Sequence, residues 1–97
     1  MKNEMTLAFD SISENEGFAR VAVAAFVAQL NPTLEEVADI RTAVSEAVTN
    51  AIIHGYPDGV HTVVVRALLH EETVELWITD EGVGMEDVKQ AMEPLYT

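Results

Sequence analysis

The stretch TLEEVADIRTAVSEAVTNAIIHG, from Thr33 to Gly55, decides the fold of this chain. Thr33 and Glu36 fit a capping box, in which a hydroxyl and a carboxylate satisfy the free amides at the start of a helix. No Gly or Pro follows until Gly55, which suits a left-handed C-terminal cap. The stretch therefore predicts one long helix of about 20 residues.

This helix is predicted to carry a polar row beside its apolar face. Glu46, Asn50 and His54 follow one another at successive helical turns and lie outside the apolar stripe. An ordinary solvated helix face has the same pattern. The row also suits chemistry, because Glu46 could take a proton and the amide oxygen of Asn50 could ligate a hard cation such as Mg²⁺. The predicted core stripe consists of Val37, Ile40, Val44, Val48, Ala51 and Ile52.

Two elements are predicted before this helix. Apolar and polar residues alternate from Met5 to Phe9, the pattern of a strand with one buried face. Ser13 and Glu16 fit a second capping box, so a helix is expected from about Glu14 to Leu30. It ends before Pro32, because the residue preceding a proline is pushed out of helical geometry.

After the long helix the sequence becomes rich in strand-forming residues. Tyr56–Gly59 has turn chemistry, and the segments Val60–Leu69 and Val74–Asp80 are predicted to form an antiparallel hairpin. A short helix is expected over Glu86–Met92. The order strand, helix, helix, strand, strand, helix predicts an α+β sandwich, with a mixed β-sheet and both long helices on one face.

The last predicted strand ends in the pattern D-x-G-x-G, formed by Asp80, Gly82 and Gly84. An ordinary exit loop has the same composition. A carboxylate at a strand end can also accept a hydrogen bond from an exocyclic amine, while glycines let backbone approach a flat ring or a phosphate closely. The pattern does not fit a calcium loop, because Gly82 stands where that motif needs a second oxygen ligand.

Composition excludes several classes of function. The 97 residues carry a formal charge of -12, and the five basic residues are scattered, which argues against direct binding of nucleic acid. The absence of Cys excludes disulfides and Cys-ligated metals. No apolar run is long enough to span a membrane and no signal peptide is visible, so a cytoplasmic protein is expected.

The first helix carries two apolar stripes, and two apolar faces require two partners. One stripe, expected to face the core, consists of Phe18, Val21, Ala22, Ala25 and Phe26. The other consists of Ala19, Val23, Ala24 and Val27, with Arg20 beside it. Both stripes could be buried within the domain. The alternative is a protein-binding or dimer face with Arg20 as its charged anchor, because arginine is enriched at binding hot spots.

The two polar motifs together resemble the ATP-binding fold of the GHKL superfamily, which includes gyrase, mismatch-repair, chaperone and histidine-kinase families. Glu46-x-x-x-Asn50 looks like its N box, and Asp80-x-Gly82-x-Gly84 looks like its first glycine box. The fuller phrase SEAVTNAIIHGY resembles the anti-sigma-factor branch, whose members are serine kinases that sequester a sigma factor. The whole chain is similar to the N-terminal two-thirds of the sporulation anti-sigma F family.

This resemblance implies roles for single residues. Glu46 would activate the attacking hydroxyl, Asn50 would hold Mg²⁺, and Asp80 would read the adenine amine. The purine pocket would be lined by Gly82, Gly84 and Met85, and His54 would belong to the same cofactor-binding motif. Histidine kinases generally place Asn at the position of Glu46, so this glutamate favours transfer to a hydroxyl, or hydrolysis, over transfer to histidine.

The resemblance also implies an activity and partners. We expect an ATP-dependent protein-serine kinase that inhibits a sigma factor, phosphorylates an anti-anti-sigma factor and forms a homodimer. The chain reaches Thr97 about where the ATP lid of the family begins, so residues 1–97 are expected to be one ATP-binding domain truncated before the lid. The alternatives are a non-catalytic α+β interaction module and another GHKL ATPase or histidine-kinase-type domain.

Overall fold

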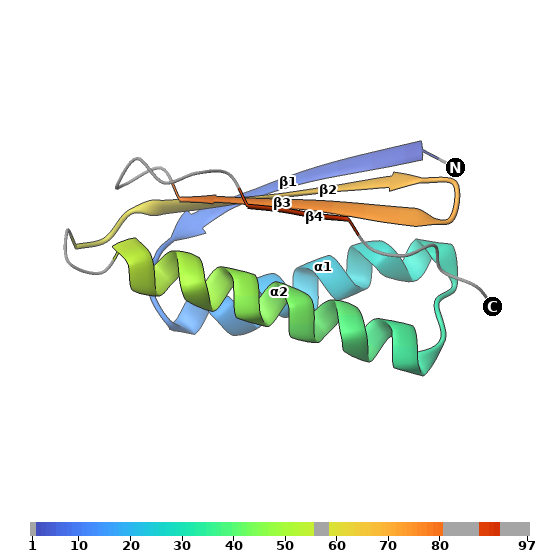
Figure 1. Cartoon of the computed structure of the whole chain (residues 1–97), viewed down its shortest axis with the longest axis horizontal. Helices are drawn as coiled ribbons and strands as arrows, with labels where there is room; N and C mark the ends of the chain where they lie inside the picture. The colour runs from blue at the N-terminus through green and yellow to red at the C-terminus, as the bar shows by residue number, and fades with distance from the viewer. Residues whose placement is uncertain (1, 56–58, 81–87, 92–97) are drawn as a thin grey trace.

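The structure, a computed structural model, describes residues 2–55, 59–80 and 88–91. Two helices pack side by side against one face of a β-sheet, and no helix formed by these described residues lies on its other face (Figure 1). The predicted α+β sandwich with both long helices on one face is therefore confirmed. The elements are β1 (Lys2–Asp10), α1 (Glu14–Val27), the 3-10 turn η1 (Ala28–Leu30), α2 (Leu34–Gly55), β2 (Thr62–His70), β3 (Thr73–Asp80) and β4 (Val88–Ala91).

The sheet has the order β1-β2-β3-β4, and each of its described pairings is antiparallel, so the expectation of a mixed sheet was wrong for this part of the chain. The physical reason is the path between β1 and β2. Because α1 and α2 run in opposite directions, the chain re-enters the sheet antiparallel to β1 (Figure 1). The predicted hairpin is confirmed, with β2 and β3 joined through a short turn in which Glu71 has a φ of 59°.

The short helix expected over Glu86–Met92 is not observed in its described part. Residues Val88–Ala91 form β4, which pairs with Glu75–Ile78 of β3. Without β4 the edge of β3 would offer unpaired backbone groups, and satisfying them can outweigh a weak helical preference over four residues.

The two expected capping boxes have different outcomes. At the start of α2, the Thr33 amide donates to Glu36 Oε1 at 2.7 Å and the Glu36 amide donates to Thr33 Oγ1 at 3.1 Å, so this box is confirmed. At the start of α1, Ser13 makes no capping hydrogen bond through its side chain. Ser13 already has helical dihedral angles, and Glu16 is engaged elsewhere, as described below.

The core lies between the sheet and the helices. On α2 the predicted stripe is confirmed for Ile40, Val44, Val48, Ala51 and Ile52, while Val37 is only partly buried. Ala47 joins the core as well, although the predicted stripe omitted it. No helix within the described part of the chain is both long and apolar enough to cross a membrane.

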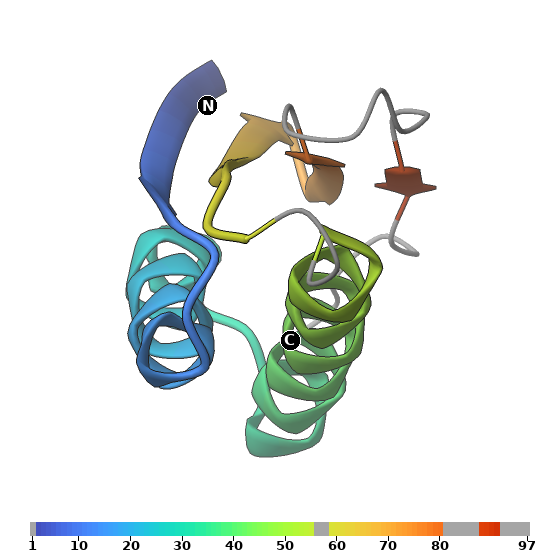
Figure 2. The same cartoon turned by 90° about the vertical axis from the view of Figure 1, so that its left-hand side faces the viewer.

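The two faces of α1 are largely the reverse of the prediction, although Phe26 of the predicted core stripe does pack against the core. Ala19, Val23 and Val27 are fully buried, whereas Phe18 and Val21 are 51% and 57% exposed. Both stripes are apolar, so their periodicity could not tell which one faces the sheet. The positions of β1 and α2 decide the matter, because together they cover the side of α1 that carries the smaller residues (Figure 2).

Candidate functional site

The polar row predicted on α2 is exposed, as expected for residues outside the core stripe. Glu46 and Asn50 are both exposed and alternate along the helix with the buried residues Ala47, Val48 and Ala51. Because the apolar stripe holds α2 against the sheet, the polar row is kept at the side of the helix. His54 lies in the last turn of α2, and its side chain is outside the described part of the structure.

Asp80 is the last residue of β3 and lies opposite Val63 in the antiparallel register. It is only 2% exposed, so a carboxyl group is buried at the end of a strand. The C-terminal ends of β3 and α2 lie at the same end of the molecule (Figure 1), which places Asp80 at the end toward which the polar row runs. The other members of the predicted glycine box, Gly82, Gly84 and Met85, lie outside the described residues.

A small polar network connects the two helices next to Glu46. Ser45 Oγ donates a hydrogen bond to Glu16 Oε2 at 2.8 Å, and the same carboxylate oxygen lies 3.8 Å from Arg20 Nη1. Arg20 Nε is buried and has no hydrogen-bond partner among the described residues. Arg20 therefore lies between α1 and α2 and not on the exposed stripe of α1.

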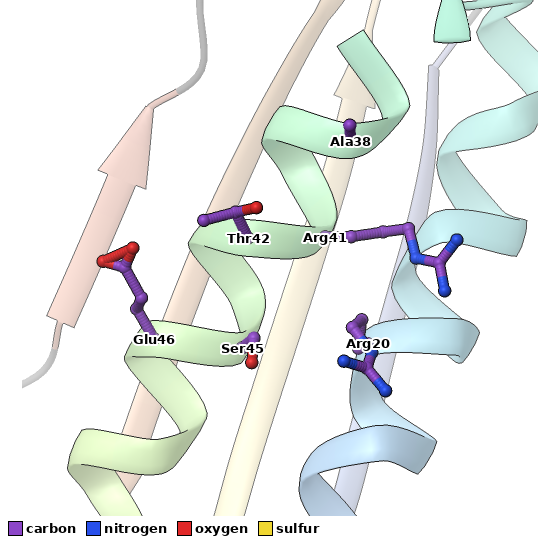
Figure 3. A pocket seen from close by; sticks show the side chains of 6 residues that line it. All are labelled: Arg20, Ala38, Arg41, Thr42, Ser45 and Glu46. Atoms are coloured by element: carbon purple, nitrogen blue, oxygen red, sulfur yellow. The ribbon is translucent and has the colours of Figure 1, made fainter. Parts of the chain in front are cut away.

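A groove of about 360 Å³ opens on the outer side of the two helices, and Figure 3 shows its lining. The guanidinium groups of Arg20 from α1 and Arg41 from α2 lie on the same side of α2, whereas the Glu46 carboxylate points to the other side. Two of the five basic residues of an acidic protein thus line one groove. The remaining lining residues are Ala38, Thr42 and Ser45.

The described residues offer few protein ligands to a metal ion beside Glu46. Within residues 2–55, 59–80 and 88–91, no three His, Cys, Asp or Glu side chains gather in a way that could hold a metal ion. Mg²⁺ commonly takes only one or two protein ligands and completes its shell with water and substrate phosphates. The single exposed amide of Asn50, one turn after Glu46, fits that kind of coordination.

The prediction missed two features of this region. The Ser45–Glu16 hydrogen bond joins residues 29 positions apart, and no local sequence pattern predicts such a contact. Arg41 was not singled out, although it shares the groove with Arg20. The pairing of Glu16 with Arg20 could have been found, since opposite charges four residues apart on a helix face one another.

Comparison with known proteins agrees with this geometry. Residues 13–97 match the model of the family described as the histidine kinase-like ATPase domain, which implies ATP binding. The chain is 58% identical over its whole length to an anti-sigma F factor from Oceanobacillus iheyensis, of which it covers 67%. It is 56% identical to the anti-sigma F factor from Clostridium perfringens and 57% identical to that from Halalkalibacterium halodurans, covering 70% and 67% of them. The chain therefore belongs to the histidine kinase-like ATPase domain family, and within it to the anti-sigma F factors.

Proposed function

We propose that this chain is the nucleotide-binding part of an anti-sigma factor that is also an ATP-dependent serine kinase. The observation that carries the proposal is the arrangement of three polar residues. Glu46 and Asn50 form an exposed pair at the side of α2, and the carboxyl group of Asp80 is buried at the end of the molecule where α2 also ends. A solvated helix face would by itself account for the exposed row, but it would not account for a buried aspartate at a strand end. The match to the ATPase domain family supports ATP as the bound nucleotide.

Each residue then has one role. The Glu46 carboxylate takes the proton of the attacking serine hydroxyl, and its exposure leaves room for a protein substrate. Asn50 ligates the Mg²⁺ that neutralises charge on the transferring phosphate. Asp80 accepts the hydrogen bond of the adenine amine, and its burial strengthens that bond because water does not compete for it. Gly82, Gly84 and Met85 line the purine pocket, with His54 beside them.

The partners follow from the same family. The chain binds and inhibits a sigma factor, phosphorylates a serine of an anti-anti-sigma factor, acts in the cytoplasm during sporulation and works as a homodimer. Arg20 contacts a protein partner. Its position supports this role, because its guanidinium lines an open groove and, among the described residues, makes one weak ion pair, at 3.8 Å from Glu16.

Phosphotransfer by the full-length protein tests this proposal. Glu46→Gln keeps the size and hydrogen bonding of the side chain but removes the base, so transfer to the protein substrate should fall by about 10²–10⁴. ATP affinity, measured by calorimetry, should stay near the wild-type value. Glu35→Gln is the matched control, because Glu35 is an exposed glutamate in the first turn of the same helix. Normal transfer by Glu46→Gln would refute the catalytic assignment, and failure of the wild type to bind Mg²⁺-ATP would favour a non-catalytic interaction module.

A further inference from the structure

A small hollow lies where the start of α1 meets the last turns of α2. Its volume is about 180 Å³, and its described lining consists of Ser13, Glu16, Thr49, Ile52 and Ile53. We call it the Ile53 hollow. A space of this size suits one side chain, because an apolar cavity of about 150 Å³ already holds a benzene molecule.

Ile53 is the exposed apolar residue of this lining. Its side chain is 59% exposed, whereas the neighbouring Ile52 belongs to the core. A single exposed aliphatic side chain is common on protein surfaces. Leu34 is such a residue, because it is 90% exposed at the start of α2 and lines neither the hollow nor the groove of Figure 3. Ile53 differs because it borders a hollow whose second apolar wall, Ile52, is fixed by the core.

Ile53 lies on the same face of α2 as Glu46. The two residues are seven positions apart, and seven residues turn an α-helix to within about 20° of two full turns. They are separated by about 10 Å along the helix axis. An extended segment covers that distance in three residues, at about 3.3–3.6 Å each. A segment that brings a serine hydroxyl to Glu46 therefore brings a residue three positions away to the Ile53 hollow.

We propose that the Ile53 hollow is a specificity pocket, which binds an apolar side chain of the protein substrate three positions from the phosphoacceptor serine. This inference rests on the proposed kinase function and names a feature of its substrate. Burying that side chain against Ile52 and Ile53 removes apolar surface of both partners from water. The contact also helps to hold the serine beside Glu46, because it anchors the segment two helical turns away.

Charge favours one arrangement of the substrate segment. Arg41 lies five positions before Glu46 on α2, and with Arg20 it makes the groove of Figure 3 basic in an otherwise acidic protein. Complementary charges attract across an interface, so an acidic substrate residue is favoured there. The described lining of the Ile53 hollow contains no basic residue. The segment that fits therefore carries its acidic residue and its apolar residue on opposite sides of the serine.

Steady-state phosphotransfer by the full-length protein tests the pocket. Ile53→Lys should raise KM for the anti-anti-sigma substrate by about tenfold, the lower end for an apolar group in a pocket, with kcat unchanged. ATP affinity in calorimetry should equal that of the wild type, and Tm should change little because Ile53 is exposed. Leu34→Lys is the matched control, because it makes the same substitution at an exposed aliphatic residue of the same helix. Its KM should stay at the wild-type value.

A change of specificity identifies the substrate residue. Two substrate variants carry aspartate three positions before and three positions after the phosphoacceptor serine. The wild-type kinase should show a KM about tenfold higher for one of them. Ile53→Lys should restore the KM for that same variant, because its lysine then faces a carboxylate.

Three results would overturn the pocket: an unchanged KM for Ile53→Lys, an equal effect of Leu34→Lys, or no recovery when lysine faces aspartate. A loss of ATP affinity in Ile53→Lys would also overturn it, because Ile53 would then belong to the nucleotide site. Failure of the proposed function gives a different result. The wild type would then transfer no phosphate to the substrate, and both proposals would fall together.

Discussion

Replacing Ser45 by Ala should measurably loosen the contact between the two helices. Ser45 Oγ donates to the Glu16 carboxylate at 2.8 Å, and hydrogen bonds to charged groups contribute about 1.5–3 kcal/mol to stability. The Glu16 side chain keeps 25% of its exposure, so water can partly replace the lost donor. Alanine also gains a few tenths of a kcal/mol in helix propensity. The free energy of unfolding should therefore fall by about 1 kcal/mol.

Urea and thermal unfolding measure this change. For a chain of this size, 1 kcal/mol corresponds to a fall in Tm of about 4–8 °C. Thr42→Ala is the matched control, because Thr42 is exposed one turn earlier on α2 and makes no hydrogen bond with a described residue. Its stability should be unchanged or slightly raised.

A double-mutant cycle isolates the pair. Ser45→Ala, Glu16→Ala and the combined variant should give a coupling energy of at least about 0.5 kcal/mol, the lower end for residues that share a hydrogen bond. The Glu16–Arg20 ion pair contributes little to the cycle, because at 3.8 Å it is long and partly exposed. Equal stability of Ser45→Ala and Thr42→Ala, or additive single effects, would show that the bond does not tie the helices together.

Three further expectations concern other parts of the molecule. Asp80→Ala should cost about 1.5–3 kcal/mol of ATP affinity, and GTP should bind poorly to the wild type, because it carries a carbonyl where the amine should be; equal ATP and GTP affinities in calorimetry would remove this role. Arg20→Ala should weaken a partner complex by at least about 2 kcal/mol with little change in Tm; a fall in Tm with unchanged partner affinity would make Arg20 structural. Leu76→Ala should lower the free energy of unfolding by about 2–5 kcal/mol, because Leu76 is fully buried in β3; urea unfolding would show a smaller loss if the core collapsed around the cavity.

The motifs illustrate what local sequence can predict about a site. The capping box at Thr33 and Glu36 formed as predicted and marks the start of α2. The apolar stripe, with a fixed angle between successive residues, is enough to place Glu46 and Asn50 outside the core. The burial of Asp80 could not be predicted in this way, since it depends on the packing around the end of β3.

The sequence by itself determined the long elements, their order and the polar row, because helical and strand periodicities are properties of consecutive residues. Only the tertiary structure decided which apolar face of α1 is buried, since Ala19 and Val23 on one side and Phe18 and Val21 on the other satisfy the same periodicity. It also decided the strand at Val88–Ala91 and the Ser45–Glu16 contact. Each of these features depends on residues that are distant in sequence. Backbone groups find hydrogen-bond partners, and apolar side chains are removed from water, only where separate elements pack together.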